Sequence, residues 1–321
     1  MRNLGTVLLF AALTVIVGSA ADRELLRLAP SGTRLLAGIQ VEQGKATPFG
    51  RFLLSRMKTD DKDFQQFVAA TGFDPTRDVE EILVASPAAG AGSRKGLMLV
   101  RGHFDMPVIL AAAKQKGATV EDYRGVALIS SPEGKTSHEG ALAFLDGSIA
   151  VAGDIENVKS AIARRAEAAT LDSTLEQKAA ELSAAHHAWM VSVVPVAEMA
   201  GNVPNANLSG AMKGNAFQAI EQVSGGADFT DGVRISAEVV TRSEKDATAL
   251  ADVVRFLASF AQMNQQGVQA PGLAAALESL DLKTEGNIAK VSFRVPEDQI
   301  EKLIHSHQHP ARVRPVAHHS K

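Results

Sequence analysis

The stretch that decides the fold runs from Gly140 to Arg165, GALAFLDGSIAVAGDIENVKSAIARR. Two apolar runs, Ala141–Leu145 and Ile149–Ala152, flank the dipeptide Asp146-Gly147. Such a dipeptide between two apolar runs predicts an antiparallel hairpin with a type I′ turn, in which both central residues have positive φ.

A helix is expected directly after this hairpin. Asp154 follows the second apolar run, and its carboxylate can accept the free N–H groups of a helix start. Ile155, Val158 and Ile162 recur at intervals of three and four residues, so one face of the helix is apolar. That face is predicted to pack back on the hairpin, which makes the whole stretch a structural unit rather than a catalytic one.

A similar unit occurs near the C-terminus. Glu285-Gly286-Asn287-Ile288 occupies the same place between two predicted strands as Asp146-Gly147-Ser148-Ile149. This weak internal repeat predicts an α+β fold of two similar lobes, each an antiparallel β-meander with helices packed on one face. Alternating βαβ units around a parallel sheet are the alternative, which the tight turns disfavour.

The first 21 residues have the pattern of a secretory signal peptide. Arg2 supplies a basic start, Val7–Val17 an apolar centre, and Gly18-Ser19-Ala20-Ala21 a small-residue cleavage site. The apolar run is shorter than the roughly 20 residues of a membrane-spanning helix, although an uncleaved anchor is the alternative. We therefore predict an exported bacterial protein, periplasmic or extracellular, with no stable membrane span after cleavage.

The predicted organisation follows from these features and from a weakly hydrophobic helical segment in the middle of the chain. Its parts are a signal peptide at 1–21, a first α+β lobe at 22–166, a helical connection at 167–185, a second α+β lobe at 186–305 and a disordered histidine-rich tail at 306–321.

Composition narrows the class of partner. The 321 residues are 45% hydrophobic with a net charge of −3, so no basic field attracts nucleic acid. There is one Trp and one Tyr, which leaves few stacking platforms for bases or sugars. The chain has no cysteine, which excludes disulfides and thiolate chemistry. The expected partner is another envelope protein or an apolar ligand.

Residues 25–165 resemble a family of uncharacterised exported bacterial proteins with repeated α+β lobes. The resemblance is carried by short structural motifs: Leu28-Ala29-Pro30, the run from Thr71 to Val79 (TGFDPTRDV), Tyr123-Arg124-Gly125-Val126, Ala143-Phe144-Leu145-Asp146 and Val151-Ala152-Gly153-Asp154. It implies an exported protein and an α+β fold, and it brings no activity and no catalytic residues.

The candidate metal ligands lie near the C-terminus. His305, His307 and His309 alternate, and alternating imidazoles on an extended chain project together toward Zn²⁺, Cu²⁺ or Ni²⁺. No acidic residue or cysteine lies among them to complete a shaped site. We therefore expect at most weak metal binding, and no cofactor is predicted.

Two short motifs match enzyme signatures only in part. Ser55-Arg56-Met57-Lys58 has the S-x-x-K spacing of serine acylation enzymes, but the Ser-Asp-Asn element of those enzymes is missing. Glu133-Gly134-Lys135-Thr136 ends like a phosphate-binding loop, but Ile129 stands where its first glycine belongs.

The sequence thus predicts a non-enzymatic exported binding or interaction protein of the cell envelope. A carrier of an apolar ligand such as a lipid is the first alternative, and a serine-type hydrolase is the second. An open pocket lined by Leu, Val and Ala would favour the carrier. Clustered buried Ser, Lys and carboxylates would favour the hydrolase.

Overall fold

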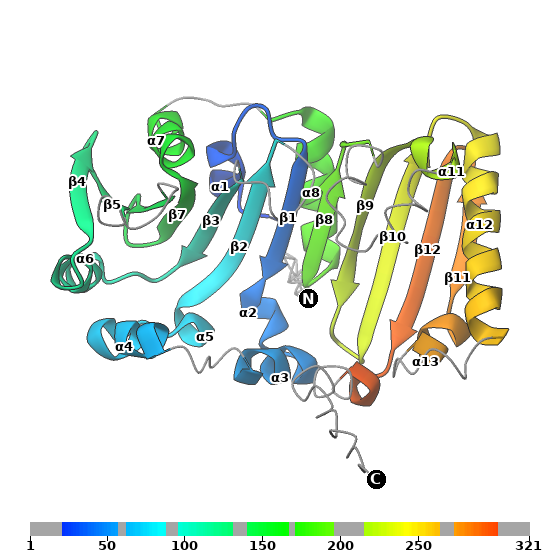
Figure 1. The fold of residues 1–321 in the computed structure, drawn as a ribbon, viewed down its shortest axis with the longest axis horizontal. Helices are drawn as coiled ribbons and strands as arrows, with labels where there is room; N and C mark the ends of the chain where they lie inside the picture. Colours follow the sequence, from blue (N-terminus) through cyan, green and yellow to red (C-terminus); the bar gives the residue numbers. More distant parts are fainter. Residues whose placement is uncertain are drawn as a thin grey trace, which may run out of the picture.

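The computed structural model describes residues 21–56, 62–87, 96–130, 140–166, 171–195, 215–263 and 273–300. Figure 1 shows how its helices and strands are arranged. The strands are β1 Leu35–Gln40, β2 Val79–Ser86, β3 Leu97–Gly102, β4 Thr119–Tyr123, β5 Val126–Ser130, β6 Gly140–Phe144, β7 Ile149–Asp154, β8 Ala188–Ser192, β9 Ile220–Asp228, β10 Val233–Thr241, β11 Asp281–Glu285 and β12 Ile288–Val295. The helices are α1 Arg23–Leu28, α2 Val41–Gly44, α3 Pro48–Arg56, α4 Lys62–Thr71, α5 Pro75–Asp78, α6 Met106–Gln115, α7 Ile155–Arg164, α8 Ser173–Ala185, α11 Asn215–Gln218, α12 Glu244–Met263 and α13 Leu273–Glu278.

The strands form one 12-stranded sheet in the order β11-β12-β10-β9-β8-β1-β2-β3-β7-β6-β5-β4. Every neighbouring pair in it is antiparallel. The antiparallel α+β class is therefore confirmed, and the parallel βαβ alternative is wrong. The separation into two lobes is not confirmed, because β1 pairs with β2 on one side and with β8 on the other. Leu36 of β1 thus lies opposite both Ala85 and Val191.

The two halves of the sheet are nevertheless built in the same way. From the middle outward, one half begins β1-β2-β3-β7-β6 and continues with β5-β4, and the other runs β8-β9-β10-β12-β11. In each half the third strand leads into a helix, α6 or α12, and a later hairpin returns to pair with it. The internal repeat expected from the two hairpin segments stays a prediction.

The predicted hairpin and helix of residues 140–165 are present, but the turn differs from the prediction. Strands β6 and β7 pair, and the Asp154 carboxylate caps α7 by accepting the N–H of Glu156 at 3.1 Å. Gly147 does not have a positive φ, so the turn is not type I′. Instead the Asp146 carboxylate accepts the N–H groups of Ser148 and Ile149 and closes a wider turn.

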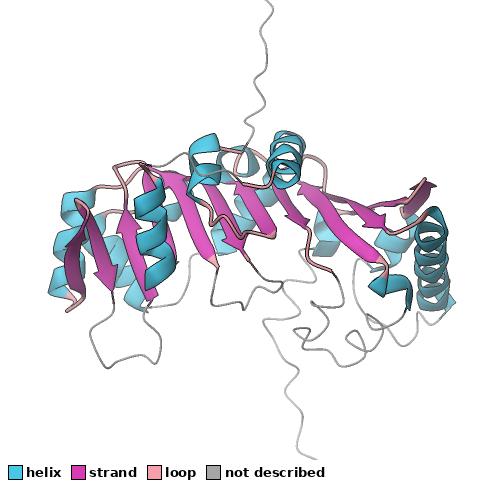
Figure 2. Cartoon of the chain, turned by 90° about the horizontal axis from the view of Figure 1, so that it is seen from above, coloured by secondary structure: helices cyan, strands magenta, loops and turns pink. Residues whose placement is uncertain are grey.

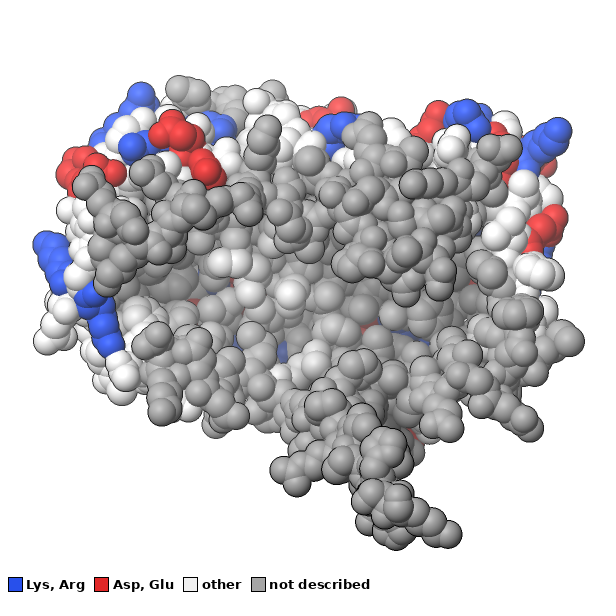
Figure 3. Space-filling model, viewed as in Figure 1, with Lys and Arg blue, Asp and Glu red and all other residues white. Residues whose placement is uncertain are grey.

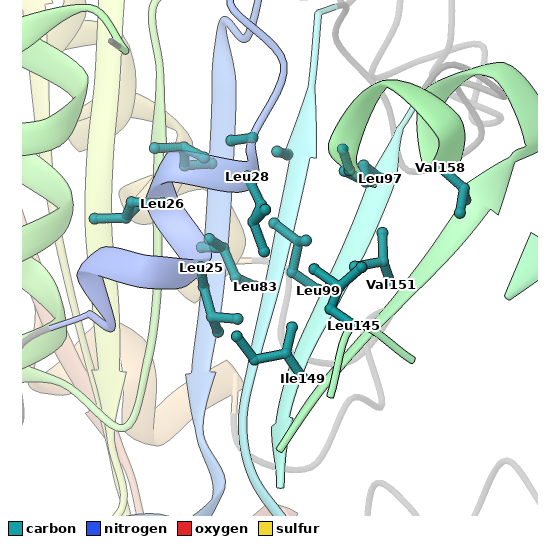
Figure 4. Close-up of a cluster of buried hydrophobic side chains, with 14 of the residues drawn as sticks. Leu25, Leu26, Leu28, Leu83, Leu97, Leu99, Leu145, Ile149, Val151 and Val158 are labelled. Carbon is teal, nitrogen blue, oxygen red and sulfur yellow. The ribbon is translucent and has the colours of Figure 1, made fainter. Parts of the chain in front are cut away.

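The main core lies between the sheet and helices α1, α7 and α8. We call the side of the sheet that these helices cover the first face. Leu25 and Leu28 of α1 point toward Leu83 and Leu99 of the sheet, and Val158 of α7 lies above the same layer (Figure 4). All five side chains are at least 98% buried, which makes this layer the largest apolar contribution to stability.

Helices also cover parts of the opposite side, which we call the second face. There α6 buries Ile109 against Phe144 and Ala150, and α12 buries Leu250 against Ala289. The prediction that helices pack on one face is therefore wrong, and Figure 2 shows helices on both sides of the sheet. The middle of the second face is left between these two helix groups.

Candidate functional site

The middle of the second face exposes large apolar side chains. Ile39, Met98, Val84 and Met190 have exposed fractions of 45%, 42%, 36% and 36%. We call these four residues the apolar patch. Contiguous exposed apolar surface on a folded protein marks an interaction site or a ligand groove more often than scattered single residues do.

Strand pairing brings these residues together from distant parts of the sequence. Met190 of β8 lies opposite Ala37 of β1, Ala37 lies opposite Val84 of β2, and Val84 lies opposite Met98 of β3. Ile39 is two positions from Ala37, so its side chain lies on the same face. The patch therefore spans the junction between the two halves of the sheet.

The same face is covered at both ends. Phe67 of α4 and Ile109 of α6 belong to one cluster over the β3–β5 side, while Leu250 of α12 covers the β9–β12 side. In Figure 3 the charged side chains of the described residues are seen mainly toward the edges of this face. The apolar patch thus lies between the two covered ends of the second face.

A second concave region, the polar groove, lies on the first face beyond α8. It has a volume of about 370 Å³. Nine of its thirteen lining residues are charged or polar: Glu181, His186, Ser236, Glu238, Asp281, Lys283, Glu285, Lys290 and Ser292. A cavity that holds a lipid is lined mainly by apolar groups, so this groove does not match the apolar-ligand alternative.

Ion pairs hold the charges of the polar groove. Nζ of Lys178 lies 3.1 Å from carboxylate oxygens of both Glu181 and Glu238. Burial lowers the pKa of Lys178, but the two carboxylates outweigh burial and raise it above its usual value. Lys290 pairs with Glu285 at 2.6 Å. These carboxylates therefore serve neighbouring lysines rather than an acid–base pair.

The groove also contains the arrangement closest to a catalytic pair. Nε2 of His186 lies 3.3 Å from Oγ of Ser236, and burial lowers the pKa of His186. Nδ1 of His186 is buried and has no hydrogen-bond partner among the described residues. A serine triad needs an acid at that nitrogen to orient the imidazole, so the pair lacks its third member.

The adjacent His187 has a structural role. Its Nδ1 accepts the N–H of Phe229 at 3.2 Å, and its ring stacks on the Phe229 ring at 5.3 Å. Within the described residues no group of three or more His, Cys, Asp or Glu could hold a metal ion.

The residues singled out from the sequence as ligands or nucleophiles are not placed by the structure. His305, His307 and His309 lie outside the described residues, as do Glu133-Gly134-Lys135-Thr136 and the tail at 306–321. The helical position of Ser55 is described but its side chain is not, and Lys58 is outside the described ranges. The apolar patch was not predicted, because continuous apolar strands such as LMLVRG indicate burial on both faces.

Comparisons with known proteins give the fold and nothing finer. No protein-family model matches the sequence, and no curated protein sequence matches it. The structure is similar to crystal form I of TP0453 from Treponema, with a TM-score of 0.51 and 8% sequence identity, over 90% of this chain and 98% of that one. At this identity the likeness concerns the fold alone. Membership of the exported bacterial family stays a prediction.

Proposed function

We propose that this chain is an exported, non-enzymatic binding protein of the bacterial cell envelope, and that the apolar patch is where it binds another envelope protein. The observation that carries the proposal is the patch itself: Ile39, Val84, Met98 and Met190 form one exposed apolar surface between two helix-covered ends of the same sheet face. Methionine is favoured at such surfaces because its flexible thioether adapts to a partner.

Export and location rest on two supports. The first is the signal-peptide pattern at 1–21. The second is the likeness in fold to TP0453, an envelope protein of unknown function. None of the helices in the described ranges is long and apolar enough to cross a membrane.

Charge substitution in the patch tests the proposal. Met98→Asp and Met190→Asp should each lower the yield of protein crosslinked to this chain in the exporting cell by about tenfold, because each places an unpaired carboxylate in a desolvated contact. Phe256→Asp is the matched control. Phe256 is 68% exposed on α12, outside the patch, so this variant should crosslink like the parent.

The same variants distinguish the lipid-carrier alternative. If the purified protein takes up lipid from vesicles, and both patch variants lose lipid while crosslinking is unchanged, the patch binds lipid and the protein-binding proposal is wrong. Equal crosslinking by parent, patch variants and control also contradicts it. Circular dichroism spectra of all three variants check that each is folded.

A further inference from the structure

The first described residue is built into the main core. Ala21 is 2% exposed and belongs to the core cluster under α1 and α8. Its backbone N–H donates to Oγ of Ser183 on α8 at 2.5 Å, and Ser183 is fully buried. The residues that adjoin the predicted cleavage site are therefore fixed inside the fold, 162 positions away from their partner in sequence.

The next backbone nitrogen faces a buried acid. The N–H of Asp22 points at both carboxylate oxygens of Glu81 on β2, at 3.3 and 3.4 Å. Glu81 is 5% exposed. Burial raises the pKa of Glu81 to about 7, although the N–H of Asp22 and the charge of Arg101 act in the opposite direction.

The charges around Glu81 do not balance. Arg101 is the cation there, and its guanidinium is engaged by the carboxylates of Asp22 at 2.6 Å and Glu24 at 2.8 Å. Gln40, the cross-strand neighbour of Glu81, and Ser183 are neutral. Three carboxylates thus share one guanidinium in a partly buried region, so one more positive charge would be stabilising.

We propose that Glu81 is the counter-ion of the α-ammonium group that signal-peptide removal creates, carried by Asp22 or by the adjoining Ala21. The proposal rests on the export signal proposed above. Hydrolysis of the peptide bond by the processing peptidase consumes one water, leaves a carboxylate on the departing leader and leaves an ammonium group on the mature chain. A start at Asp22 places that group directly against Glu81. A start at Ala21 places the ammonium group against Ser183, one residue before the backbone nitrogen that faces Glu81.

Processing would then change the energetics of the fold without moving an element. A peptide N–H offers Glu81 one neutral donor, whereas an ammonium offers a charge-assisted hydrogen bond, which is about twice as strong. Before cleavage the fold holds a buried carboxylate without a full partner. After cleavage the same carboxylate forms an ion pair between the N-terminus and the middle of the sheet.

The test compares chains of defined N-terminus at pH 8, each with Glu81 or with Glu81→Gln. One chain starts with a free amine at the residue found on the exported protein, and the other keeps Gly18-Ser19-Ala20 in front with an acetylated end. Glu81→Gln should lower the folding equilibrium constant of the free-amine chain at least tenfold. It should not lower the folding equilibrium constant of the acetylated chain. The two effects differ because glutamine removes the ion pair in the first chain and an uncompensated charge in the second.

Glu80→Gln is the matched control. It changes the neighbouring carboxylate, which pairs with His103, so its effect should be equal in both chains. Titration of the α-amino group by NMR gives a second readout: its pKa should lie above about 8 in the parent and return to about 8 in Glu81→Gln.

Equal effects of Glu81→Gln in the two chains, with an α-amino pKa that does not change, would overturn the proposal. The mass of the exported protein tests the export proposal separately. An intact Met1 refutes export, while a first residue beyond 22 overturns the role of Glu81 even if export is correct.

Discussion

At the scale of single residues, the sheet contains a position where only glycine fits. A Cβ built on Gly38 of β1 would lie 2.4 Å from Cε2 of Trp189, because the indole ring of the neighbouring strand lies directly on the glycine. Trp189 is 3% exposed, so it has little room to move. The largest side chain of the core is therefore accommodated by the absence of one on β1.

Gly38→Ala should lower the free energy of unfolding by roughly 1–3 kcal/mol, since the added methyl group overpacks the site. Urea denaturation followed by the fluorescence of Trp189 measures the change. Gly32→Ala is the control, because no atom lies within 4 Å of its added Cβ, and it should change stability by less than about 0.5 kcal/mol. A Gly38→Ala protein as stable as the parent would show that the indole can shift.

At the scale of elements, the β6–β7 turn depends on a side chain rather than on a special backbone conformation. Asp146 accepts from Ser148 and Ile149 and also pairs with Arg165 at the end of α7 at 2.8 Å. Burial raises the pKa of Asp146, but these hydrogen bonds and Arg165 outweigh it and hold the pKa below its usual value. One carboxylate thus joins the hairpin to the helix that packs on it.

Asp146→Ala should destabilise the protein by about 1–3 kcal/mol, because two partly buried N–H groups lose their acceptor. Gly147→Ala should have little effect, since its φ is not positive and the nearest atom to an added Cβ is 3.8 Å away. A lowered folded-state pKa means that the contribution of Asp146 is present above pH 3.8 and lost as pH falls below it. Thermal unfolding at pH 7 and pH 3 measures both effects. Equal stability of the two variants at pH 7 would contradict this account of the turn.

The sequence predicted the parts of this element that depend on local signals. Asp154 caps α7, and the apolar spacing of Val158 and Ile162 gives its buried face. The turn type was wrong because the dipeptide Asp-Gly suits both a type I′ turn and a turn closed by the aspartate side chain, and the sequence does not say which forms.

Long-range features gave no such signal. The pairing of β1 with β8 joins residues about 150 positions apart, and a continuous apolar strand does not specify its neighbours. The apolar patch was missed because Met98 and Met190 stand between buried residues in apolar strands, and such strands indicate burial on both faces. The role proposed for Glu81 needs three segments to meet, which only the fold shows.

At the scale of the whole molecule, the β1–β8 pairing should make the two halves unfold together. Leu36 and Val191, which face each other across this junction, are fully buried. The main cluster includes Leu128 from one half and Leu175 of α8 from the other, so loss of either half exposes core side chains of its neighbour. We therefore expect a single cooperative transition rather than one for each half.

Calorimetry should show one heat-absorption peak with a ratio of van't Hoff to calorimetric enthalpy near 1. The fluorescence of Trp189, the one tryptophan of the chain, should change at the same temperature as the far-ultraviolet circular dichroism. Val191→Asp places a charge in the buried junction, so it should lower the midpoint temperatures of both signals by the same number of degrees. Two separated transitions, of which Val191→Asp moves only one, would show that the halves are independent folding units despite their shared sheet.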